Sequence, residues 1–152
     1  ILSVNNYSTI NIKFIFIAIL LGLALFAVIV FFMPIEAGIA PQTTHLFTYL
    51  VPAFTAFSVM AAWVVPAQRI RKIDRNAPLE DKLANWRTAF IFRLALLESP
   101  GFLNIIAYLL TKNTLFLYFF AVVFVLMSLQ FPTVGKIASE LNLNYNEQQK
   151  LE

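Results

Sequence analysis

One carboxyl group lies inside a long apolar segment, where it could do chemistry. Glu98 belongs to residues 91–110, IFRLALLESPGFLNIIAYLL, and follows Arg87 by eleven positions. At 1.5 Å per helical residue, this separation is about 16 Å, so we expect Glu98 near the middle of a membrane-spanning helix. An isolated carboxylate there costs several kcal/mol. Glu98 should therefore be protonated at pH 7 or bound to a partner.

The residues around Glu98 favour a proton or cation site. Pro100 cannot donate to the carbonyl four residues before it, so one backbone acceptor is left free. Gly101 allows the helix to bend and another helix to approach. Thr55 and Ser58 of the preceding apolar segment are expected at the same depth as Glu98. The alternative is a structural role, in which Glu98 donates a buried hydrogen bond or holds a neighbouring helix.

Two further polar side chains, Arg93 and Asn104, belong to the same segment. Five helical residues turn through about 500°, so Arg93 and Glu98 point about 140° apart and should not pair. Arg93 can extend to lipid headgroups or meet Ser128 and Gln130 of the last apolar segment. We expect Arg93, Asn104, Ser128 and Gln130 to make polar contacts between helices.

Composition places these residues in a membrane protein. The 152 residues are 60% hydrophobic and 12% charged, whereas soluble domains are about 25% charged. Helices are the expected spanning structure, because each satisfies its own backbone hydrogen bonds in lipid. Four segments can cross about 30 Å of hydrocarbon: residues 12–33, 46–66, 88–110 and 114–132. The sequence predicts a single-domain, all-α integral membrane protein with a bundle of four transmembrane helices.

Basic residues predict the orientation of this bundle. The loop at 67–87 carries Arg69, Arg71, Lys72, Arg75, Lys82 and Arg87, whereas the loop at 34–45 has no Lys or Arg. The positive-inside rule therefore puts the 67–87 hairpin, the 133–152 tail and both termini in the cytoplasm. Trp63 and Trp86 fall at the cytoplasmic ends of their segments, as interfacial anchors do. The compact loops suggest a bacterial inner membrane.

The tail contains a short amphipathic stripe, formed by Val134, Ile137, Ala138 and Leu141. Asn144 or Asn146 can cap a last helical turn after it. Two placements are open for this tail. It can lie on the membrane surface or on a partner, or it can pack back onto the chain's own loop.

Several classes of chemistry are excluded by residue type. The chain has no cysteine and one histidine, His45, so thiolate metal sites, disulfides and multi-histidine haem sites are ruled out. It has no phosphate-binding loop, dinucleotide-binding motif or nucleophile elbow. We therefore predict no enzyme, no catalytic residue, no metal and no cofactor. The net charge of +3 reflects topology, and we expect no nucleic-acid partner.

Residues 75–110 resemble the carboxylate-bearing half of the helical hairpin of rotary ATP synthase subunit c. Arg75, Pro78, Arg87, Thr88 and Glu98 follow the order of that family's polar loop, basic entry and mid-membrane carboxylate. The resemblance implies that Glu98 binds and releases a proton. The 46–66 segment lacks the family's glycine-rich spacing, so a rotary ring is not implied.

Two functions fit these observations. The first is an accessory or scaffolding subunit of a membrane complex, whose partners are the lipid bilayer and other membrane subunits or further copies of the chain. The alternative is a proton-coupled transport or conduction element that uses Glu98. A lipid or small-molecule carrier is a third class, which no residue singles out.

Overall fold

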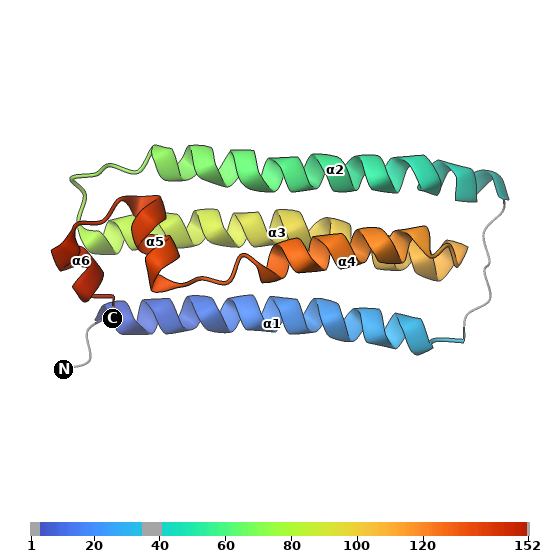
Figure 1. The fold of residues 1–152 in the computed structure, drawn as a ribbon, viewed down its shortest axis with the longest axis horizontal. Coiled ribbons are helices and arrows are strands. Elements are labelled where there is room, and N and C mark those ends of the chain that lie inside the picture. Colours follow the sequence, from blue (N-terminus) through green and yellow to red (C-terminus); the bar gives the residue numbers. More distant parts are fainter. Residues whose placement is uncertain (1–3, 35–40, 152) are drawn as a thin grey trace.

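The computed structural model describes residues 4–34 and 41–151, and all the regular structure in these ranges is helical. This confirms the all-α prediction. The helices are α1 (Val4–Phe32), α2 (Pro41–Arg71), α3 (Leu79–Thr111), α4 (Leu115–Ser128), α5 (Val134–Leu141) and α6 (Tyr145–Gln149). The helices α1, α2, α3 and α4 lie side by side, and α5 and α6 lie across one end of them (Figure 1).

Three of these helices, α1, α2 and α3, are long and apolar enough to cross a membrane. They indicate an integral membrane protein. The fourth helix, α4, has 14 residues and is therefore about 21 Å long, short of the roughly 30 Å of hydrocarbon. The segment expected at 114–132 is thus helical only to Ser128. Pro132 explains the early end, because it restricts the residue before it to extended conformations.

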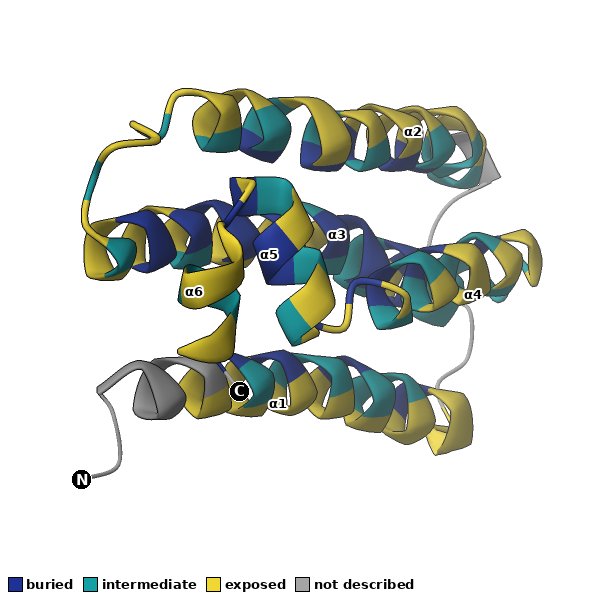
Figure 2. Ribbon diagram, turned by 60° about the vertical axis from the view of Figure 1, so that its left-hand side comes forward, coloured by how far each residue is buried: buried dark blue, intermediate teal, exposed yellow. Residues whose placement is uncertain are grey.

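The central helix of the fold is α3, which packs against α1, α2 and α4. Half of its most apolar stretch is buried, compared with 17% in α1 and 28% in α2. In Figure 2 the buried residues of α1 and α2 lie on the sides that face α3, and their outer sides are exposed. The outer helices therefore owe most of their burial to α3.

A close contact joins α1 to α3 near the middle of both helices. A Cβ atom built at Gly101 would lie 2.9 Å from the Cδ2 atom of Leu23, so glycine is what allows this approach. Leu23 is completely buried. Phe26 lies three residues after Leu23, and Phe102 directly follows Gly101. The centroids of their two rings are 5.1 Å apart. The helix that approaches Gly101 is thus α1 of the same chain.

The tail folds back over the end of the bundle that carries the α2–α3 loop (Figure 1). Ile137, Ala138 and Leu141 of α5 are buried in one apolar core with Leu83 and Trp86 of α3. The expected amphipathic stripe therefore meets the chain's own helices, which is one of the two placements considered. After α5, the carboxylate of Glu147 accepts the backbone N–H of Asn144 at 3.0 Å, which fixes the start of α6.

Candidate functional site

Three polar residues, Arg93, Glu98 and Asn104, lie in the apolar part of α3. Glu98 and Asn104 are six residues apart, a rotation of about 600°, so they point about 120° away from each other. Asn104 is completely buried, whereas Glu98 is only partly buried. Arg93 lies nearer the tail end and is also buried. Each residue therefore has a different environment.

Asn104 joins α3 to α2. Its Nδ2 atom donates to the hydroxyl oxygen of Thr55 at 2.8 Å and to the carbonyl of Pro100 at 2.8 Å. The Thr55 hydroxyl in turn donates to the carbonyl of Val51 at 2.8 Å. The Oδ1 atom of Asn104 is buried and has no hydrogen-bond partner among the described residues. The contact is therefore interhelical and uses the donors, but not the acceptor, of the Asn104 amide.

Glu98 lies at the border of the exposed side of α3. Ala95 and Ser99 beside it are exposed, and the Ser99 hydroxyl donates to the carbonyl of Ala95 at 2.8 Å. The described part of the chain provides no hydrogen bond or ion pair to the Glu98 carboxyl group. This carboxyl group therefore has no partner within the chain as described.

The expected grouping of Glu98 with Thr55 and Ser58 needs correction. Thr55 is hydrogen-bonded to Asn104, and Ser58 is buried one turn further along α2, on the same side of that helix. Depth alone suggested the grouping, but helical rotation turns Glu98 away from α2. Pro100 and Gly101 are both buried, and α3 continues through them to Thr111.

Arg93 is held by the tail. Its Nη1 atom donates to Oε1 of Glu140 in α5 at 3.0 Å, and the other carboxylate oxygen accepts the indole N–H of Trp86 at 2.6 Å. The Trp86 ring stacks on Phe90 with centroids 5.0 Å apart. Trp86 is completely buried, so it is a core residue, not the interfacial anchor that its position suggested.

The expected contacts of Arg93 with Ser128 and Gln130 are therefore not made. The Ser128 hydroxyl donates to the carbonyl of Phe124 in its own helix at 2.8 Å. The side-chain oxygen of Gln130 accepts from Nζ of Lys136 at 2.6 Å. The physical reason is the end of α4 at Ser128, because the chain that follows brings α5 against α3.

A second ion pair fastens the tail. Nζ of Lys82 in α3 lies 2.9 Å from Oε1 of Glu147, and the two side chains are 7% and 22% exposed. The hydrogen bond from Lys82, followed by that from the backbone of Asn144, lowers the pKa of Glu147. Burial lowers the pKa of Lys136, Glu140 opposes this shift and Arg93 adds to it.

Sequence reasoning missed the roles of Glu140, Lys82 and Glu147. One signal was available for Glu140, which follows Ile137 by three residues and so lies beside the apolar stripe of the tail. A carboxylate at that position can reach a buried basic residue of α3 once the apolar stripe packs against that helix. Within the described ranges, no three or more His, Cys, Asp or Glu side chains are grouped to hold a metal ion.

The chain matches no protein-family model, no curated protein and no solved structure. The resemblance of residues 75–110 to ATP synthase subunit c therefore stays a prediction.

Proposed function

We propose that this protein is an accessory or scaffolding subunit of a membrane complex, and that another membrane-spanning helix packs on the exposed side of α3. The observation that carries the proposal is the Glu98 carboxyl group, which has no partner among the described residues. A carboxyl group at the edge of a lipid-facing surface costs free energy when it has no partner, and a helix that packs over it can supply one.

The side of α3 next to Glu98 suits a helix contact. Its exposed residues beyond Arg93 include Ala95 and Ser99, which are four residues apart and therefore lie on one side of the helix. Small residues at such a spacing let two helices approach closely in a membrane. Among the described residues, α1 and α2 each pack mainly on α3 and not extensively on one another, so this side of α3 lies between them and is left exposed.

The depth of Glu98 allows polar groups of a partner near the membrane boundary to reach it. Since Arg93 is covered by α5, the lipid-facing part of α3 begins near Arg93. Glu98 is five residues further on, about 7.5 Å, and Asn104 is eleven residues further, about 16 Å. On this count, Asn104 lies nearer the middle of a 30 Å hydrocarbon layer, and Glu98 lies within reach of polar groups at its boundary.

We also propose that α4 and the extended residues after it form the fourth crossing. The tail and the α2–α3 loop lie at the same end of the bundle, so the chain must return across it after α3. The free basic residues of the loop then favour the cytoplasm for this end and for both termini. A bacterial inner membrane is the compartment we propose.

The alternative function, proton-coupled transport or conduction, rests on the same unpaired carboxyl group. It has less support, because Thr55 is hydrogen-bonded to Asn104 and Ser58 lies on the same side of α2, so neither is grouped with Glu98. A proton path would have to be built from groups on a partner.

The test is native mass spectrometry of the tagged chain after gentle extraction from its own membrane. We expect a reproducible partner subunit or a second copy to co-purify. Ala95→Phe should abolish this association, because the new ring would fill the exposed side of α3. Ala53→Phe is the matched control, since Ala53 is also exposed, on α2. A chain that is solitary in every mild detergent and lipid, or an association that survives Ala95→Phe, would contradict the proposal.

A further inference from the structure

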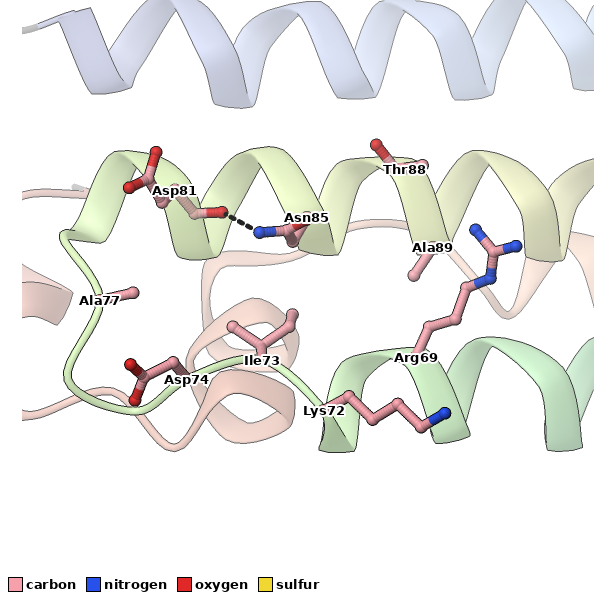
Figure 3. A pocket seen from close by; sticks show the side chains of 9 residues that line it. All are labelled: Arg69, Lys72, Ile73, Asp74, Ala77, Asp81, Asn85, Thr88 and Ala89. Carbon is pink, nitrogen blue, oxygen red and sulfur yellow. Dashed lines mark hydrogen bonds between the residues drawn. The ribbon is translucent and has the colours of Figure 1, made fainter.

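A polar pocket of about 500 Å³ lies between the end of α2 and the start of α3 (Figure 3). Arg69 belongs to the last turn of α2, and Asp81 belongs to the first turn of α3. Since the apolar stretch of α2 ends here, the pocket lies at the depth of lipid headgroups. The pocket is separate from Glu98 and from the ion pairs that hold the tail.

The charges of the pocket are divided between its two ends. Figure 3 shows Arg69 of α2 and Lys72, which directly follows α2, at one end, and Asp74 of the loop and Asp81 of the first turn of α3 at the other. None of these four residues takes part in an ion pair with another described residue. Two exposed cations and two exposed anions thus line opposite ends of one pocket. One of the anions, Asp74, also accepts the backbone N–H of Asn76 on Oδ1 at 2.9 Å.

Arg69 is held in place without losing its hydrogen-bond donors. Its guanidinium carbon lies 4.8 Å above the centroid of the Phe92 ring, a cation–π contact, and its N–H groups donate to no described residue. Phe92 is 42% exposed, so an apolar surface continues from the cationic end of the pocket toward the membrane.

We infer that this pocket binds the headgroup of an aminophospholipid, a lipid that carries a phosphate diester and a primary ammonium group. The N–H fork of Arg69 and the ammonium of Lys72 suit phosphate oxygens. The carboxylates of Asp74 and Asp81 suit the donors of a primary ammonium. An anionic headgroup without an amine would place its phosphate in a pocket with two uncompensated carboxylates, and a quaternary ammonium has no N–H to donate.

The lipid test measures retention by the full chain in native mass spectrometry. The detergent solution holds equal amounts of phosphatidylethanolamine, phosphatidylcholine and phosphatidylglycerol. We expect phosphatidylethanolamine to be retained several-fold over the other two. Arg69→Ala should lower its retention about fivefold, the effect of one basic residue at a membrane surface. Arg87→Ala is the matched control, because Arg87 follows the same loop but does not line the pocket.

A second pair of variants tests recognition of the amine. Asp81→Asn should remove the preference for phosphatidylethanolamine over phosphatidylcholine, whereas Glu80→Gln, its neighbour outside the pocket lining, should keep it. Equal retention of the three lipids, or equal losses in Arg69→Ala and Arg87→Ala, would overturn the inference. Soluble phosphoethanolamine that bound as tightly as the lipid would overturn the assignment to a membrane lipid.

Discussion

The two polar regions of α3 differ in how completely their groups are paired. At the tail end, Glu140 receives hydrogen bonds on both carboxylate oxygens from Arg93 and Trp86, and Lys82 is paired with Glu147. In the middle of the helix, Glu98 has no partner among the described residues, and the amide oxygen of Asn104 has none. Buried polar groups usually find partners. We therefore propose that the tail end serves folding and that the exposed side of α3 beside Glu98 serves assembly.

The largest effect should come from breaking the paired region. Glu140→Ala leaves Arg93 and the indole of Trp86 buried without an acceptor, which should lower the free energy of unfolding by about 3 kcal/mol. This value is at the low end for buried pairs because the Glu140 side chain is 24% exposed. Ser139→Ala on the exposed side of α5 is the control. Denaturant unfolding in detergent measures both, and equal stability of the two variants would contradict the assignment.

A smaller effect is expected where pairing is partial. A double-mutant cycle of Asn104→Leu with Thr55→Val should give a coupling of about 0.6 kcal/mol and no more than ~1.7 kcal/mol. The coupling is modest because Thr55 keeps its bond to the carbonyl of Val51. A cycle of Asn104→Leu with Ser58→Ala should give none. If the two cycles coupled equally, Asn104 would not be specific for Thr55.

The pairing of Glu147 should make docking of the tail sensitive to acid. Its pKa is lowered in the folded chain, so its contribution is complete above the ordinary glutamate pKa of about 4.3 and is lost as the pH falls through the lower, folded value. The effect should be about 0.2–1 kcal/mol, as for partly exposed pairs. The intrinsic rate of amide exchange itself falls on acidification, so the measurement is the protection of α6 after correction for that rate. This protection should decrease on acidification in the wild type. In Glu147→Gln, protection should already be lower at neutral pH, with little further change.

The smallest effect on stability should come from Glu98. Glu98→Gln in the isolated chain should change the free energy of unfolding by less than about 0.5 kcal/mol, because no described residue binds the carboxyl group. The same substitution should weaken association with a partner in native mass spectrometry. A large loss of stability in the isolated chain would instead show that Glu98 is part of the fold.

The sequence predicted the regular structure better than the polar contacts. Apolar length predicted the long helices. The helical stripe of the tail left two placements open, and in the structure Ile137 and Leu141 are buried against the chain's own helices. The partner of Arg93 depends on where the chain turns after α4, so it could not be derived from spacing within α3. The depth of Glu98 was also counted from Arg87, although α5 covers the helix as far as Arg93. Glu98 and Thr55 are separated by rotation about the axis of α3. This separation could be inferred only once the position of α2 was known.

The central place of α3 has a consequence for the order in which the protein is made. During synthesis, α1 and α2 emerge first and reach the bilayer before the helix against which they pack. Each must therefore be apolar enough to stay there unaccompanied, and α1 has the highest mean hydropathy of the three long helices, 3.2, against 1.8 for α2 and 1.5 for α3. The helix with the most polar residues is thus inserted last of the three, when two neighbours are already in place to receive it.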